Sequence, residues 1–298
     1  MGRAVLASEE VDQFFVDGEH GRDRLEFTSY GTGDAWVVLL PPLLVPRTVH
    51  DRTARALAAS GLHVLTLDPL GHGRSDRPAD PLAYSVSVFA DQVVALLDHV
   101  GATRAVIGGS AVGANVALEV AVRAPQRVAG LLLDAPALDN ALAAQLALLG
   151  PGMYAARFAP LLVTAARWGT RPLPARVLPQ TLRLTRDVLD QRPGPMAALL
   201  HGVLFGRLAP SAAERREIAT PTLVLARPLD VLHPAADAEL VAGEISGAQL
   251  ERAQVAGEWR RIPERLDIIA ARFARQCVHP GHRTGIAPVR RVRRSRQP

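Results

Sequence analysis

The chain has 298 residues, of which 48% are hydrophobic and 21% are charged, and its formal net charge is +5. This length and balance allow a full hydrophobic core, and they exclude a wholly disordered or fibrous chain. One α/β domain with an insertion is the expected organisation for such a chain.

The positive charge is concentrated at the C-terminal end. Six arginines lie there without an acidic residue among them: Arg283, Arg290, Arg291, Arg293, Arg294 and Arg296. Without them the net charge becomes −1, so the remaining chain predicts no basic face and no nucleic-acid partner. We interpret residues 277–298 as a basic disordered tail, and a nucleic-acid binder is the least favoured function because it rests on this tail alone.

The cysteine content and the N-terminal sequence bear on the compartment. Cys277 is the single cysteine and cannot form an internal disulfide. Glu9 and Glu10 stand where a leader peptide has a basic stretch followed by an apolar run. We therefore expect a cytoplasmic protein.

The first half of the chain alternates between strand and helix patterns. Alternating segments at 13–16 and 24–30 predict an antiparallel hairpin, and the apolar run 35–40, ended by Pro41 and Pro42, predicts a buried strand. The following predicted elements are a helix at 49–60, a strand at 63–68, a helix at 87–100, a strand at 104–107, a helix at 112–123 and a strand at 128–134. This alternation predicts a parallel sheet covered by helices.

After Asp134 the alternation stops for roughly seventy residues, which prolines divide into pieces that we expect to be short helices. These pieces are shorter than the roughly twenty residues that span a bilayer, so we expect no membrane partner. The pattern resumes with strands at 222–226 and 249–254 and a helix at 263–276. We predict a core of 11–136 and 211–276 with a helical lid of 137–210 inserted between its parts.

The segment 106–115, VIGGSAVGAN, joins a predicted strand to a predicted helix, as a nucleophile elbow does. If Ser110 were the nucleophile, the β-branched Val112 would lie two residues after it, where the backbone packs too closely. If Ala111 occupies that position, Gly109 and Gly113 flank it on both sides. The second register fits the steric requirement, so we place the nucleophile position at Ala111.

Three motifs in order, LDPLGHGRSD at 67–76, the segment above and RAPQRV at 123–128, resemble the α/β-hydrolase superfamily. The resemblance extends from about residue 24 to 276. It implies a mostly parallel eight-stranded sheet with a helical lid, and a serine where this chain has Ala111. We interpret Ala111 as a serine replaced to inactivate the enzyme, and an original alanine is the alternative.

The resemblance also implies the remaining machinery. The backbone N–H groups of Val112 and Leu43 would form the oxyanion hole, and Asp230 would be the acid that orients a histidine. Glu258 stands where the family has its catalytic histidine, and a carboxylate with a pKa near 4.3 is a poor base for a serine hydroxyl. His233 is the nearest substitute in sequence.

Two further histidines, His72 and His201, are candidates for a structural or a functional role. We expect His72, in the Gly-His-Gly turn, to be structural. For His201 the sequence leaves open whether the side chain faces a pocket or solvent.

Two functions follow from these residues. The first is a hydrolase or acyltransferase that cleaves a hydrophobic ester, thioester or lactone with a serine at position 111 in its active form. The alternative is a non-hydrolytic member of the fold, which steers a cyclisation or elimination or only binds a ligand. Both predict a hydrophobic small-molecule substrate without a cofactor or metal, and both leave open a homodimer.

Overall fold

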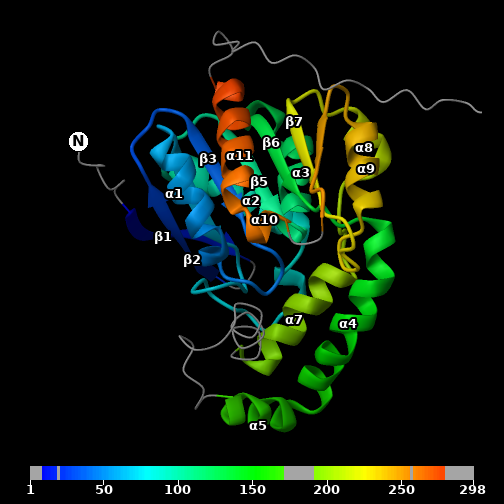
Figure 1. Ribbon diagram of the computed structural model, residues 1–298. Helices are drawn as coiled ribbons and strands as arrows, with labels where there is room; N and C mark the ends of the chain where they lie inside the picture. Colours follow the sequence, from blue (N-terminus) through cyan, green and yellow to red (C-terminus); the bar gives the residue numbers. More distant parts are fainter. Residues whose placement is uncertain (1–8, 19–20, 171–190, 256–257, 279–298) are drawn as a thin grey trace, which may run out of the picture.

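The computed structural model describes residues 9–18, 21–170, 191–255 and 258–278. In this part of the chain eight strands form one sheet in the order β1-β2-β4-β3-β5-β6-β7-β8 (Figure 1). Their bounds are β1 Glu9–Gly18, β2 Gly21–Tyr30, β3 Trp36–Leu40, β4 His63–Asp68, β5 Ala105–Ser110, β6 Val128–Asp134, β7 Thr222–Ala226 and β8 Gln249–Arg252. The pairs β1–β2 and β2–β4 are antiparallel and all others are parallel, which confirms the predicted mostly parallel sheet.

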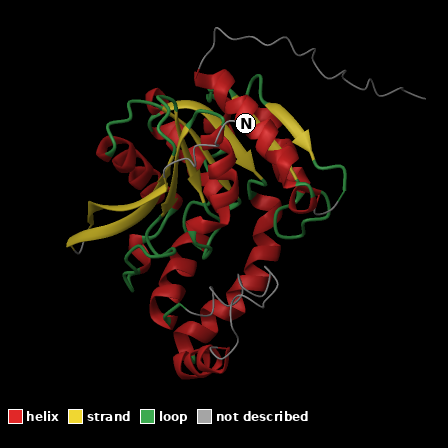
Figure 2. Cartoon of the chain, turned by 60° about the vertical axis from the view of Figure 1, so that its left-hand side comes forward, coloured by secondary structure: helices red, strands yellow, loops and turns green. Residues whose placement is uncertain are grey.

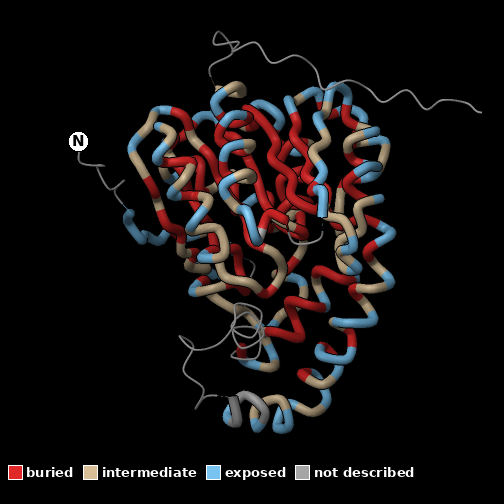
Figure 3. Tube along the Cα trace, in the orientation of Figure 1, coloured by how far each residue is buried: buried red, intermediate tan, exposed pale blue. Residues whose placement is uncertain are grey.

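Helices cover both faces of the sheet because its strands are apolar on both faces. Helices α1 (Asp51–Ala59) and α11 (Pro263–Val278) pack with Val37 and Leu39 of β3. Helices α2 (Val86–His99), α3 (Val112–Arg123) and α9 (Ala235–Glu244) pack on the opposite face with Val38 and Leu40. The buried strands between these two layers form the core (Figure 3).

The shorter elements lie in the connections. They are the 3-10 helices η1 (Arg47–His50), η2 (Pro81–Ala83) and η3 (Pro125–Arg127), and the α-helices α8 (Ala212–Arg216) and α10 (Glu258–Arg261). Strand β5 extends three residues beyond its predicted end at Ile107, through Gly108 and Gly109 to Ser110. These residues pair with Leu132, Leu133 and Asp134 of β6, so ladder hydrogen bonds between neighbours outweigh the low strand propensity of glycine.

The predicted inserted segment, residues 137–210, contains α4 (Asp139–Phe158), α5 (Pro160–Thr170) and α7 (Pro193–Leu204). These helices lie beyond one end of the sheet in both views (Figures 1 and 2). Because α4 follows the C-terminal end of β6, this is the end at which the parallel strands finish. Residues 171–190 of the segment lie outside the described part, as do residues 279–298 of the predicted tail.

One expectation about this segment was wrong, because Pro151 does not end a helix. Helix α4 runs through it for 20 residues. A proline inside a helix removes the hydrogen bond to the carbonyl four residues earlier, here that of Ala147. Both Ala147 and Pro151 are exposed, so water can hydrate the unbonded carbonyl and the helix continues.

Hydrogen bonds tie the inserted segment to the core. The Asp237 carboxylate of α9 accepts from the N–H groups of Leu138 and Ala141 at 2.7 and 3.1 Å, which places the start of α4. The Gln145 amide donates to the Leu232 carbonyl at 3.1 Å. No described helix is long and apolar enough to cross a membrane.

Helix α3 packs very closely against the end of β3. A Cβ atom on Gly109 would lie 2.5 Å from the Gly113 carbonyl carbon and 2.8 Å from the Leu40 oxygen. A Cβ atom on Gly113 would lie 2.7 Å from the Pro41 oxygen and still closer to that of Leu40. Only glycine therefore allows this approach of helix and strand.

Replacing Gly113 with alanine should lower the free energy of unfolding by about 1–3 kcal/mol, because the new methyl group overlaps two backbone oxygens that cannot move without shifting β3. Gly152→Ala is the matched control. A Cβ atom at Gly152 in α4 meets nothing within 4 Å, so this change should stabilise by about 0.5–1 kcal/mol. Urea unfolding followed by circular dichroism measures both, and equal effects of the two changes would contradict the packing.

Candidate active site

The tight turn between β5 and α3 is centred on Ala111. This residue has φ 54° and ψ −118°, a conformation that residues other than glycine rarely adopt. Its N–H donates to the Asp134 carbonyl at 2.9 Å, and its carbonyl accepts from the N–H of Ala114. The strained residue lies between Gly109 and Gly113, so the geometry favours Ala111 over Ser110 as the residue at the nucleophile position.

Ser110 has a different environment. It is the last residue of β5 and its hydroxyl donates to the Asp134 carboxylate at 2.7 Å. The register of the sheet explains this contact, because Ser110 and Asp134 are paired across β5 and β6. The Ser110 hydroxyl is thus hydrogen-bonded to the neighbouring strand β6.

The two residues proposed for the oxyanion hole follow the ends of neighbouring strands. Leu43 follows β3 and Val112 follows β5, and the last residue of β3, Leu40, is paired with Gly109 of β5. Leu43 lies in a turn closed by the hydrogen bond from the Val45 N–H to the Pro42 carbonyl at 3.1 Å. Val112 begins α3, where a backbone N–H has no intrahelical partner. Among the described residues neither N–H group is bonded to an acceptor, so both remain available to a ligand oxygen.

A polar cluster that was not predicted from the sequence lies at the same end of the sheet. Arg227, directly after β7, forms a two-pronged ion pair with Asp134, with one N–H to oxygen distance of 3.0 Å. The negative charge of Asp134 holds the pKa of Arg227 above its ordinary value. The position of both residues at the C-terminal ends of neighbouring strands was the signal that could have identified them.

His50 lies close to this cluster. Its Nε2–H donates to the carbonyl of Leu40, the last residue of β3, at 2.9 Å. Burial lowers the pKa of His50, while the nearby charge of Asp134 acts in the opposite direction. The ring is therefore neutral at pH 7 and keeps the lone pair of Nδ1.

Asp230 and His233 form a pair in the loop after β7. The His233 ring nitrogen Nδ1 lies 3.3 Å from the Asp230 carboxylate, which also accepts the N–H groups of Leu232 and His233 at 3.0 Å. Burial acts to raise the pKa of Asp230, but the hydrogen bonds from His233 outweigh it and leave the pKa below the ordinary value. In the described part of the chain no hydrogen bond joins this pair to Ala111.

Glu258 has a geometry that argues against a general base. Its buried carboxylate accepts the Gln254 N–H and pairs with the guanidinium of Arg265 on α11. The Gln254 N–H and the positive charge of Arg265 hold the pKa of Glu258 below its ordinary value. A base for a serine hydroxyl needs a raised pKa, so this carboxylate supports the packing of α10 on α11 instead.

His72 and His201, the two further histidines considered in the sequence, have different environments. His72 is buried, donates from Nδ1 to the Leu70 carbonyl at 3.0 Å, and has a pKa lowered to about 4 by burial. This is the structural role expected for it. His201 on α7 is exposed beside Phe205, with ring centroids 5.1 Å apart, so it faces solvent.

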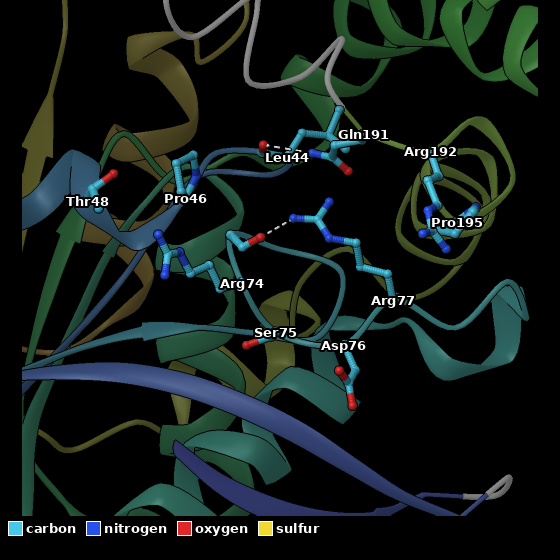
Figure 4. Close-up of a pocket in the computed structure, with 11 residues that line it drawn as sticks. Leu44, Pro46, Thr48, Arg74, Ser75, Asp76, Arg77, Gln191, Arg192 and Pro195 are labelled. Carbon is cyan, nitrogen blue, oxygen red and sulfur yellow. Dashed lines mark hydrogen bonds between the residues drawn. The ribbon is translucent and has the colours of Figure 1, made fainter. Parts of the chain in front are cut away.

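A cavity of about 670 Å³ opens between the inserted segment and the core (Figure 4). Its lining differs from the apolar surface expected beneath a lid, since Arg74, Arg77 and Arg192 contribute to it beside Leu44 and Pro46. The apolar side chains of α7, including Leu199 and Val203, are instead packed into the core. The described residues contain no group of three or more His, Cys, Asp or Glu side chains that could hold a metal ion.

The lowered pKa of Glu258 gives a prediction about stability. A carboxylate with a depressed folded-state pKa stabilises the fold above its unfolded pKa near 4.3, and this contribution is lost as the pH falls through the folded value. Glu258→Gln should therefore lower the Tm at pH 7, and the difference from the parent should shrink below about pH 4.

The control is Glu264→Gln, which removes an exposed carboxylate paired with Arg52 at 3.1 Å and should change the Tm less. Thermal unfolding between pH 3 and 8 measures both variants. An unchanged Tm for Glu258→Gln at pH 7 would show that the ion pair with Arg265 does not hold the C-terminal helices.

Comparisons with known proteins agree with the fold. The family model described as the alpha/beta hydrolase fold matches residues 45–259. A putative non-heme haloperoxidase from Mycobacterium phage D29 is 34% identical over 115 residues, which cover 38% of this chain and 40% of the phage protein. The aligned region is thus less than half the length of that curated relative.

Solved structures match over a larger share of the chain. A hydrolase from Pseudomonas aeruginosa PA01 aligns with a TM-score of 0.71 and 24% identity, covering 88% of this chain and 98% of that one. Est816, described as an N-acyl homoserine lactone degrading enzyme, aligns with a TM-score of 0.67 and 26% identity, covering 87% and 99%. With the family model spanning most of its length, the chain belongs to the α/β-hydrolase fold family.

Proposed function

We propose that this protein is a hydrolase of hydrophobic esters or lactones in which Ala111 replaces the serine nucleophile. The observation that carries the proposal is the backbone at Ala111, with φ 54° and ψ −118°. Holding a non-glycine residue in such a conformation costs about 1–3 kcal/mol, and such strain is concentrated at functional sites. A turn that keeps this strain around a methyl group fits a position built to present a reactive side chain.

The groups around the turn support acyl transfer. The N–H groups of Val112 and Leu43 are available to stabilise the oxyanion that forms when a nucleophile attacks a carbonyl. We assign Asp230 as the acid and His233 as the base, because their contact at 3.3 Å leaves the second ring nitrogen of His233 to accept a proton. We do not assign the role of base to Glu258, since its charge is neutralised by Arg265.

The hydrophobic small-molecule substrate is proposed from the inserted segment and from one relative. We propose that α4, α5 and α7 form a lid, since they lie beyond the edge at which the parallel strands end. Several large apolar side chains of α4 and α5 are exposed, including Phe158, Leu161 and Leu162. The name of Est816 records a lactone as its substrate, which fits the bond type proposed here.

A second candidate is a non-hydrolytic member of the fold that binds a ligand or steers a cyclisation or elimination. The observation that favours it is the double replacement of a standard triad, with Ala111 at the nucleophile position and Glu258 held by Arg265. The two candidates differ in what a restored serine would do.

The change Ala111→Ser should create turnover of hydrophobic aryl esters or lactones, at least about tenfold above the parent protein. The reason is that a nucleophile opens the covalent route, while the backbone donors of the proposed oxyanion hole are free to bind the substrate oxygen. Hydrolysis of p-nitrophenyl butyrate and of an acyl homoserine lactone measures it, and a fluorophosphonate probe reports whether the hydroxyl introduced at position 111 is labelled.

The control is Ser110→Ala in the Ala111→Ser background, because the Ser110 hydroxyl is bonded to Asp134 and should not react. Activity should survive this second change. Loss of probe labelling on removal of Ser110 would contradict the Ala111 register, and an unlabelled, inactive Ala111→Ser protein would favour the non-hydrolytic candidate.

In the Ala111→Ser protein, His233→Gln should lower kcat more than it changes KM, since a base acts on the reaction step rather than on binding. His201→Gln is the matched control, because this exposed histidine on α7 should leave both constants unchanged. Steady-state kinetics at pH 7.5 compares them. If His50→Gln abolished kcat and His233→Gln had no effect, the base would be His50.

A further inference from the structure

The cavity between the inserted segment and the core is formed by three parts of the chain that are distant in sequence. One side comes from the loop with Leu44, Pro46 and Thr48, a second from the loop 73–77, and a third from Gln191, Arg192 and Pro195 at the start of α7. The Gln191 amide donates to the Leu44 carbonyl at 3.1 Å and so connects the third side to the first (Figure 4). The cavity therefore borders the turn that contains Leu43.

Three arginines contribute to this lining: Arg74, Arg77 and Arg192. In Figure 4 the guanidinium of Arg77 lies between Arg74 on one side and Arg192 on the other. Within the described part of the chain, no carboxylate oxygen lies within 4.0 Å of any of the three. Other arginines pair closely, such as Arg123 with Asp91 at 2.8 Å.

The acidic residues nearby are already engaged. Asp76 also lines the cavity, but its carboxylate accepts the N–H of Arg24 at 2.8 Å. Asp68, buried behind the loop 73–77, accepts the backbone N–H groups of Arg47 and Arg74 and pairs with the Arg47 guanidinium. Among the described residues, the positive charge of the three arginines is therefore left largely uncompensated.

Arg77 carries the clearest signal because it is partly buried. Its guanidinium donates to the Gly73 carbonyl within its own loop. Burial lowers the pKa of Arg77, although the charge of Asp68 acts in the opposite direction. A half-buried guanidinium without a carboxylate partner is unfavourable, and an anionic ligand would relieve it.

The N-terminus of α7 adds little to this site. Its dipole favours an anion, but Pro193 and Pro195 have no N–H group to donate. The Met196 N–H donates to the Arg192 carbonyl, so within helix positions 193–196 Gly194 alone has an N–H without an acceptor among the described residues. Recognition must come from the guanidinium groups, which bind carboxylates and phosphates in a two-pronged geometry.

We propose that this cavity binds an amphiphilic organic anion. Its carboxylate or phosphate is held by Arg77 and Arg192, with Arg74 at the rim, and its aliphatic part packs against Leu44, Pro46 and Pro195. This assigns a ligand subsite that borders the turn containing Leu43. The assignment concerns binding and does not depend on a reaction at Ala111, so failure of the hydrolase proposal would leave it intact.

The test is isothermal titration calorimetry on the full chain at low salt, with octanoate, octyl phosphate and the neutral octanamide below micelle-forming concentrations. We expect one or both anions to bind and octanamide to bind much more weakly. A preference for octyl phosphate over octanoate would identify the head group as phosphate, and the reverse would identify it as carboxylate. Equal affinity for octanamide would overturn the proposal.

Variants locate the site. Arg77→Gln and Arg192→Gln should each weaken anion binding about tenfold, the loss typical of one charge-assisted hydrogen bond. The matched control is Arg216→Gln on α8, an exposed arginine outside the cavity. Arg77→Lys keeps the positive charge and should retain part of the affinity. Because Arg192 is exposed, Arg192→Gln should lower the affinity without disturbing the core. Unaltered affinity in both cavity variants, or an equal loss in Arg216→Gln, would also overturn the proposal.

Discussion

The close approach of α3 to the end of β3 is the constraint on which the site depends. Gly109 and Gly113 leave no space for a Cβ atom between the turn at Ala111 and the carbonyl groups of Leu40 and Pro41. The chain between them must therefore turn within three residues, and Ala111 takes a positive φ to make that turn. The same contact places the N–H of Val112 beside the chain that leads to Leu43, because β3 and β5 are neighbours in the sheet.

Hydrogen bonds extend this local geometry to the inserted segment. Asp237 holds the start of α4, and Asn115 of α3 donates to the carbonyl groups of Ala137 and Leu208 at 2.6 and 2.9 Å. The helix that begins at the strained turn thus contacts both ends of the inserted segment. Gln191, two residues before α7 begins, donates to the Leu44 carbonyl. This hydrogen bond links the start of α7 to the turn that contains Leu43.

Several carboxylates near the core are paired with arginines. Asp68 and Glu26 share Arg47, and Asp134 pairs with Arg227, so each of these carboxylates has a cation. These pairs satisfy hydrogen-bonding groups that would otherwise be costly to bury. Among the described residues Arg74, Arg77 and Arg192 of the cavity have no carboxylate within ion-pair distance, so their charges can interact with a ligand.

The sequence by itself determined the order of strands and helices, because the alternation of apolar runs with helical periods reports which residues must be buried. It also placed the turn at Ala111, since the flanking glycines reflect a steric requirement that is local in sequence. Only the tertiary structure decided which polar groups meet. Ser110 and Asp134, or Gln191 and Leu44, are far apart in the chain, and their contacts depend on strand register and helix docking. The sequence also showed that Glu258 stands where the family has a histidine. Its ion pair with Arg265 depends on how α10 packs against α11, so only the tertiary structure could show it.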